Sequence, residues 1–157
     1  MIQSVISKAV SHKGYKEGAN NDNIFAALAG HSNHQPWCAT FVVAVFKEAG
    51  EALAIPNTAY CPTFETWGKA QKRTITKQAA KRGDLILFDF DKSGTSQHIG
   101  IAIHDFDLKT NTISTIEGNT GDNSQVNGDG VYVKTRQLQF IRAVVRPNYK
   151  ETPWTKI

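Results

Sequence analysis

The segment PWCATFVVAVFKEAG, residues 36–50, carries the features that decide the fold class. Proline is tolerated where a helix begins and glycine often follows where one ends, so the segment predicts a helix over residues 37–49. Val42, Val43 and Val45 favour a strand, but a run of about 13 residues favours a helix. The segment is apolar on nearly every side, which predicts a buried helix.

Helical patterns precede and follow this segment, and strand patterns occupy the rest of the chain. Further helices are expected in the first ten residues and over 23–28 and 63–71. Strands are expected over 84–90, 98–106, 112–117, 131–136 and 141–146. The turns between these strands are too short for crossover helices, which indicates antiparallel neighbours. The sequence therefore predicts an α+β fold, with N-terminal helices packed on a C-terminal antiparallel sheet of about five strands.

Length and composition exclude several classes of protein. The 157 residues suit one domain, expected over residues 1–150, with a short tail over 151–157. No apolar run approaches the roughly 20 residues of a membrane span, and two cysteines do not make a disulfide scaffold. The N-terminus lacks the basic start of a secretory signal, so a protein acting outside the cytoplasm would need another exit route.

The charge of the chain favours anionic partners without selecting one. The net charge is +4, and six basic residues with no acidic one fall within 69–82. This basic stretch is either a solvated face or an electrostatic footprint beside an active cleft. Nucleic acid is not expected, because there is no zinc finger, no RNP-like motif and no regular alternation of aromatic and basic residues.

Cys38 lies in the first turn of the buried helix, where free backbone N–H groups and the helix dipole stabilise negative charge. A thiolate there has a lowered pKa and is a good nucleophile, although a buried structural cysteine is the commoner case. Cys61 precedes Pro62 and has no helix-start position as favourable as that of Cys38. We expect Cys61 to be structural or to line the cleft wall, and zinc is not expected without a CxxC pair.

His98 opens a strand whose two faces differ. Isoleucines at 99, 101 and 103 form a core face, whereas Gly100 and Ala102 leave room on the face of His98. We expect the helix that carries Cys38 to lie on this small face. His98 could then act as the general base, the alternative being an ordinary hydrogen-bonded surface histidine.

Glu117 and Asn119 end the following strand, and their equal parity lets both side chains point one way. If this strand is antiparallel to that of His98, either side chain could hold the imidazole in the required tautomer. The alternative is a solvated glutamate and a turn-forming asparagine.

Five short motifs together resemble the CHAP domains, the cysteine- and histidine-dependent amidohydrolases/peptidases of the broader NlpC/P60, papain-like group. They are Pro36-Trp37-Cys38-Ala39-Thr40-Phe41-Val42, Arg82-Gly83-Asp84-Leu85-Ile86-Leu87-Phe88, His98-Ile99-Gly100-Ile101-Ala102, Glu117-Gly118-Asn119-Thr120 and Gly130-Val131-Tyr132-Val133-Lys134-Thr135-Arg136. They follow the order of the family over positions 36 to 136. The segment 14–21 also resembles family members from phage lysins.

The resemblance implies a papain-like fold and a set of residue roles. Cys38 matches the nucleophile, His98 the base, Glu117 the residue that orients the base, and Asn119 a further polar residue of the same site. By analogy with papain-like enzymes, Gln35 is expected to help bind the oxyanion.

Trp37 of the nucleophile motif is expected to contact substrate or the oxyanion. Some related lysins carry an acidic calcium-binding loop ahead of the cysteine, but residues 30–34 hold no carboxylate. We therefore expect no metal and no cofactor.

The expected function is peptidoglycan hydrolysis by a Cys-His-Glu thiol mechanism, as an N-acetylmuramoyl-L-alanine amidase or an endopeptidase. A monomeric phage endolysin acting at the bacterial wall fits best, its positive charge adding attraction to the anionic envelope. Three alternatives stay open. They are an antibacterial effector delivered into a competitor, a thiol amidase acting on a small γ-glutamyl or polyamine amide, and a non-enzymatic binder of anionic polymer.

Overall fold

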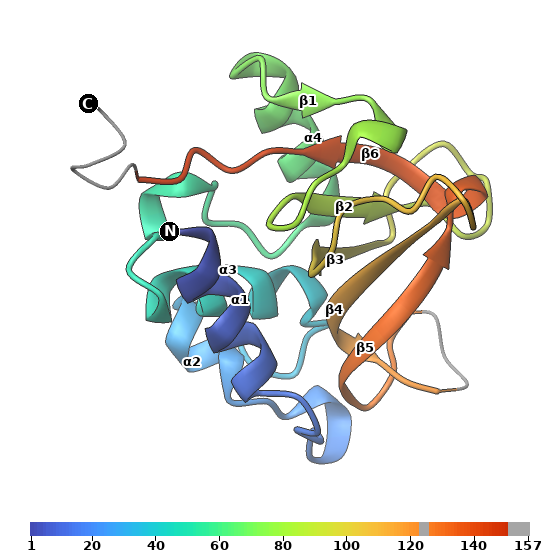
Figure 1. Cartoon of the computed structure of the whole chain (residues 1–157). Helices are drawn as coiled ribbons and strands as arrows, with labels where there is room; N and C mark the ends of the chain where they lie inside the picture. The colour runs from blue at the N-terminus through green and yellow to red at the C-terminus, as the bar shows by residue number, and fades with distance from the viewer. Residues whose placement is uncertain (123–125, 151–157) are drawn as a thin grey trace.

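The computed structural model describes residues 1–122 and 126–150, within which four α-helices precede most of a six-stranded sheet (Figure 1). The helices are α1 (Ile2–Ser11), α2 (Phe25–Ala29), α3 (Cys38–Glu48) and α4 (Cys61–Ala70). The strands are β1 (Thr74–Ile75), β2 (Leu85–Phe88), β3 (His98–Ala102), β4 (Thr112–Thr120), β5 (Gly130–Gln137) and β6 (Ile141–Val145). This order of elements confirms the α+β class.

The strands are arranged in the order β1-β6-β2-β3-β4-β5, and every neighbouring pair is antiparallel. The five strands expected from the alternation are all present. The sixth, β1, pairs with β6 through Thr74↔Val145 and Ile75↔Val144. Two residues are too few to show an alternating pattern, which is why the sequence did not indicate it.

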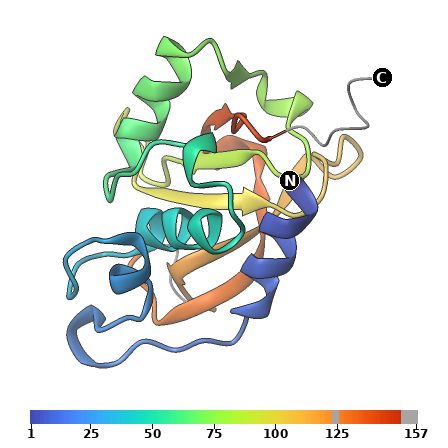
Figure 2. The ribbon, with the colours of Figure 1, turned by 90° about the vertical axis from the view of Figure 1, so that its left-hand side faces the viewer.

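Helix α3 packs on the isoleucine face of the sheet. Ile99 and Ile101 of β3 and Ile116 of β4 are fully buried in one cluster with the apolar side chains of α3. Figure 2 shows α3 in cyan beside β3 in yellow, with α1 and α2 packed against α3. The expectation that α3 would cover the face of Gly100 and Ala102 is therefore wrong. The large apolar surface of the isoleucines attracts the helix more strongly than room on the other face does.

The small residues on the opposite face of β3 make room for a neighbouring side chain instead. A Cβ on Gly100 would lie 2.7 Å from Cγ of Glu117 on β4. Glycine at this position therefore allows a carboxylate to lie flat across the strand beside the start of β3. A second, smaller apolar cluster that includes Phe88, Ala102 and Ile113 covers the rest of this face.

Two parts of the chain lie outside the described residues. The predicted tail over 151–157 is one, and residues 123–125 of the polar loop before β5 are the other. Among the residues that the structure describes, no helix is long and apolar enough to cross a membrane.

Candidate active site

Cys38 is the first residue of α3 and is almost entirely buried, with 5% of its surface exposed. The backbone N–H groups of a first helical turn have no partner within the helix, so they favour a negative charge at this position. The sequence predicted this placement. The apolar body of α3 fixes it, because nine consecutive residues from Cys38 to Phe46 are buried.

His98 and Glu117 lie together at the start of β3 and in the second half of β4, and both are fully buried. Nε2 of His98 is 2.8 Å from Oε1 of Glu117. The ionised carboxylate can only accept, so Nε2 carries the proton of this hydrogen bond. Within the described chain Nδ1 of His98 has no hydrogen-bond partner. The imidazole is nevertheless close enough to Cys38 for each to shift the pKa of the other.

Glu117 is held from two further directions. Thr115 Oγ1 donates to Oε2 at 2.5 Å, and Arg136 donates from Nε to Oε2 at 2.9 Å and from Nη2 to Oε1 at 2.5 Å. The guanidinium of Arg136 also lies over the ring of Phe90, 4.8 Å from its centroid. Sequence reasoning missed Arg136, because a single arginine on an alternating strand is ordinarily a solvated residue.

The pKa values in this cluster favour a charged pair. Burial opposes charge on Glu117, but His98 and Arg136 outweigh it and lower the pKa of Glu117 to about 2. Burial likewise opposes charge on His98, but Glu117 and Cys38 outweigh it and raise its pKa to about 9. The pKa of Cys38 lies well below its usual range, because a hydrogen bond with Cys61 and the nearby His98 outweigh its burial. The directions of these pKa shifts favour a thiolate on Cys38 beside a protonated His98.

Cys61 is the first residue of α4, which corrects the expectation that it lacks a favourable helix start. Proline is well tolerated in the first helical turn, so the helix begins two residues before the predicted start, with Pro62 inside it. The thiol is 6% exposed, and its Sγ lies 3.5 Å from Sγ of Cys38. Neither of these two cysteines is in a disulfide.

A groove of about 440 Å³ opens over the two thiols. Its walls come from the loop before α3, the start of α4 and the loop before β3. The lining residues are Gln35, Pro36, Cys38, Ala59, Tyr60, Cys61, Pro62, Ser96 and Gln97. Gln35, Cys38 and Cys61 thus line the same groove, which agrees with the expectation that Cys61 lines the cleft wall. The expected role of Gln35 in binding the oxyanion stays a prediction.

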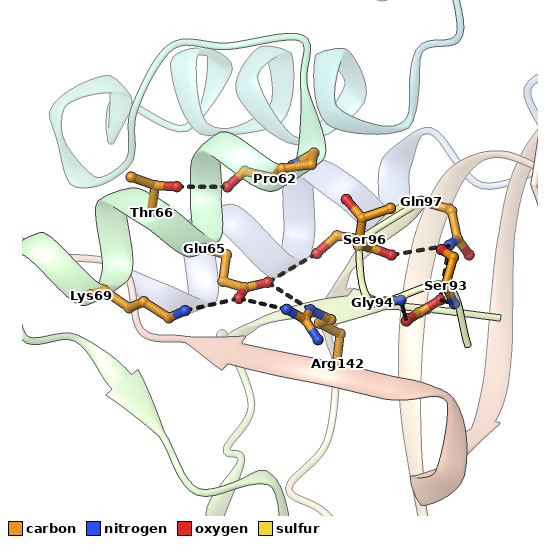
Figure 3. A network of polar contacts seen from close by, with 11 residues as sticks. Pro62, Glu65, Thr66, Lys69, Ser93, Gly94, Ser96, Gln97 and Arg142 are labelled. Carbon is orange, nitrogen blue, oxygen red and sulfur yellow. Dashed lines mark hydrogen bonds and ion pairs between the residues drawn. The ribbon is translucent and has the colours of Figure 1, made fainter. Parts of the chain in front are cut away.

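A polar network joins α4 to the loop that leads into His98 (Figure 3). Glu65 of α4 accepts hydrogen bonds from Ser96 Oγ at 3.2 Å and from Arg142 Nε on β6 at 3.2 Å, and it pairs with Lys69 at 3.2 Å. The next residue, Gln97, donates from Nε2 to several oxygens of its own loop, including Oδ1 of Asp91 at 2.6 Å. These contacts fix the start of α4 relative to β3, and so fix Cys61 relative to His98.

Two further predicted site residues, Trp37 and Asn119, are both buried. Trp37 is 1% exposed, stacks on Phe25 and donates from its indole N–H to Glu17, so its side chain belongs to the core and has no surface for substrate. Asn119 is fully buried after an irregularity in the pairing of β4, with a φ of 56°. Its carboxamide has no hydrogen-bond partner in the described chain, and its predicted place in the site stays a prediction.

The model of the NlpC/P60 family matches residues 27–153, most of the chain and all of the site. The chain belongs to the NlpC/P60 family. NlpC/P60 proteins are cysteine hydrolases of peptidoglycan, in agreement with the predicted class of enzyme. No curated protein matches the chain.

Solved structures similar to this NlpC/P60 chain share its fold at low identity. The endolysin LysIME-EF1 is 16% identical with a TM-score of 0.60, and the match covers 95% of this chain and 65% of that one. The P60 domain of antigen MAP1204 from M. avium subspecies paratuberculosis is 21% identical with a TM-score of 0.56, and the coverage is 92% and 93%. Ly7917 is 10% identical with a TM-score of 0.55, and the match covers 94% of this chain and 62% of Ly7917. The chain thus spans about two thirds of LysIME-EF1 and of Ly7917.

Proposed function

We propose that this NlpC/P60 chain hydrolyses amide bonds in the peptide part of peptidoglycan, with Cys38 as nucleophile and His98 as acid and base. The observation that carries the proposal is a buried cluster in which His98 bonds Glu117 and lies close enough to Cys38 to shift its pKa, with the thiol of Cys38 at a groove. A binding protein has no need of a buried charged pair, which is costly unless it is fully partnered. The non-enzymatic alternative is therefore not favoured.

The chemistry follows from where the protons lie. The Cys38 thiolate attacks the carbonyl carbon of the scissile amide, and the carbonyl oxygen takes up the negative charge. His98 then gives its proton to the leaving amine, the C–N bond breaks, and a thioester remains on Cys38. His98 next removes a proton from water, which attacks the thioester and releases the acid. Glu117 keeps the imidazole oriented and stabilises its charged form.

The oxyanion requires donors on the groove side of Cys38. The backbone N–H of Cys38 is one, because the first amides of a helix have no partner within it. The side chain of Gln35 is the other, and its place in the groove lining supports this role. Removing one such donor typically costs about 100-fold or more in turnover.

The narrower assignment is a CHAP-type endolysin domain acting at the bacterial wall. The pairing of His98 with a glutamate rather than another polar residue supports the CHAP type. The shared fold of the endolysin LysIME-EF1 is consistent with an endolysin. The net charge of +4 suits an anionic envelope.

Digestion of purified sacculi tests the proposal and identifies the bond. Wild type and Cys38→Ala are incubated under reducing conditions with sacculi of several chemotypes, and the soluble products are read by mass spectrometry. We expect products from wild type alone. Whole stem peptides separated from glycan would indicate an amidase, and cleaved stems or cross-bridges would indicate an endopeptidase. The absence of products from every chemotype, or equal products from Cys38→Ala, would overturn the proposal.

A further inference from the structure

Cys61, the second cysteine of the site, lies within hydrogen-bond distance of Cys38. The Sγ atoms of Cys38 and Cys61 are 3.5 Å apart, and both residues are more than nine-tenths buried. Each is the first residue of its helix, α3 with 11 residues and α4 with 10. Two helix N-termini therefore converge on one sulfur pair, in a place where a single negative charge is favoured.

The neighbours decide which sulfur carries that charge. His98 interacts with Cys38 and with Glu117, and it does not contribute to the pKa of Cys61. An imidazolium beside one thiol of a pair makes that thiol the thiolate, and the other then keeps its proton. Cys61 is left as a thiol whose S–H faces an anion, which is a stronger hydrogen bond than one between neutral thiols.

We propose that Cys61 is a catalytic residue whose S–H donates a hydrogen bond to the Cys38 thiolate and holds it ready for attack. The proposal rests on Cys38 being the nucleophile of the proposed function. No proton leaves Cys61 at any step. The hydrogen bond weakens when the sulfur of Cys38 is acylated and loses its charge. It forms again when the thioester breaks and Cys38 departs as the thiolate.

The surroundings of the two sulfurs support this role. The titratable groups that face the Cys38 thiol are Cys61 from α4 and His98 from β3, and Glu117 of β4 acts on it through His98. Glu65, one turn after Cys61, faces Ser96, Lys69 and Arg142 (Figure 3). Consistent with a donor, the neighbouring Cys38 and burial hold the pKa of Cys61 well above its usual range.

The network around Glu65 keeps the donor in place. It joins the first turns of α4 to Ser96, two residues before His98, and to Arg142 of β6. The separation of the two sulfurs is thereby set by α4, the sheet and the loop before β3 together. Contacts that hold a side chain in a fixed position are typical of residues of a functional site.

The test measures the thiolate of Cys38 without any peptidoglycan. Iodoacetamide is added to the whole chain over a range of pH, and peptide mass spectrometry assigns the label to Cys38 or Cys61. The variants are Cys61→Ala, which removes the donor, and Cys61→Ser, which keeps one. Thr66→Ala is the matched control, since this residue of α4 is exposed and its hydroxyl donates to the Pro62 carbonyl of the same helix.

In wild type we expect Cys38 to be labelled already at acid pH, and Cys61 to stay unlabelled. Cys61→Ala should move the midpoint of Cys38 labelling upward by about one pH unit, an approximately tenfold slower reaction at pH below both midpoints. Cys61→Ser should lie between Cys61→Ala and wild type, and Thr66→Ala should match wild type. An unchanged midpoint in a folded Cys61→Ala, or in Cys61→Ser if Cys61→Ala does not fold, would overturn the proposal.

The labelling experiment and the digestion of sacculi can fail independently of each other. If wild type shows the low midpoint and the variants shift it, but no sacculi are cleaved, the hydrogen bond stands and the substrate is wrong. If sacculi are cleaved and the midpoint does not respond to Cys61, the function stands and Cys61 is a packing residue.

Discussion

Arg136 and Glu117 form a bidentate ion pair beside His98, with Nε of Arg136 2.9 Å from Oε2 and Nη2 2.5 Å from Oε1. Both side chains are buried, and Oε1 also accepts the hydrogen bond of His98. One carboxylate thus balances two cations. The position and the charge of Glu117 depend on Arg136 as well as on His98.

Removing the charge of Arg136 should destabilise the protein. Arg136→Met leaves the buried Glu117 with one cation, and breaking a buried pair from one side costs about 3 kcal/mol or more. Thermal unfolding at neutral pH should show a large fall in Tm. Arg136→Lys keeps the positive charge but cannot form the bidentate contact with Glu117. Its Tm should therefore lie between those of wild type and Arg136→Met. A Tm for Arg136→Met equal to that of wild type would contradict the pairing.

Activity should depend on pH as a bell-shaped curve. Attack requires the thiolate of Cys38 and the imidazolium of His98 at the same time. The low pKa of Cys38 places the acid limb well below the pKa of a free thiol, and loss of the His98 proton places the alkaline limb near pH 9. These limbs belong to the interacting pair rather than to single residues. Measured kcat/KM that rises steadily from pH 6 to 11 would argue against the ion pair.

Peroxide should switch the enzyme off reversibly through the two thiols. The Cys38 thiolate attacks a peroxide oxygen, the O–O bond breaks, and sulfenic acid and hydroxide form. Cys61, 3.5 Å away, then attacks that sulfur, its proton leaves with the sulfenic oxygen as water, and a disulfide forms. The hydroxide from the first step takes a proton from solvent, so one peroxide yields two waters. The intact mass should fall by about 2 Da, and dithiothreitol should restore both mass and activity.

The variant Cys61→Ser distinguishes reversible disulfide formation from irreversible oxidation of Cys38. In Cys61→Ser no disulfide can form, and Cys38 should pass to the sulfinic and sulfonic acids, which dithiothreitol does not reduce. Equal recovery of Cys61→Ser and wild type after peroxide would show that the thiols do not pair.

Gly118 should not tolerate a side chain. A Cβ there would lie 2.6 Å from Cβ of Phe41 and 2.8 Å from Cζ3 of Trp37, so alanine would push β4 away from α3. Overpacking of this kind costs about 1–3 kcal/mol. Gly118→Ala should lower the Tm, and activity should fall with it because Glu117 is the adjacent residue. A Tm and a turnover both equal to those of wild type would show that α3 can shift to accommodate the methyl group without loss of stability.

The fold could be predicted because its signals are local. Proline and glycine mark the ends of the segment around α3, and alternation over five stretches gives most of the sheet. The face on which α3 packs could not be predicted in the same way. Gly100 makes room for any neighbour, and only the contacts between strands show that the neighbour is Glu117.

The sequence predicted the candidate site residues whose chemistry depends on their position along a helix or strand. It missed the residues whose roles depend on tertiary contacts. Cys38 at a helix start and His98 at a strand start are of the first kind. Arg136 and Cys61 are of the second, because their roles come from Glu117 and Cys38 at distances that no spacing in the sequence encodes. Pro62 was the one local sign that α4 begins at Cys61.

The most direct test of the central claim compares the two single cysteine-to-serine variants on the same sacculi. Cys38→Ser should lose turnover by about 1,000-fold or more, since it removes the nucleophile. Cys61→Ser should keep measurable turnover with the same products, because its hydroxyl still donates to the thiolate. The reverse result, an active Cys38→Ser and an inactive Cys61→Ser, would show that the nucleophile has been assigned to the wrong sulfur.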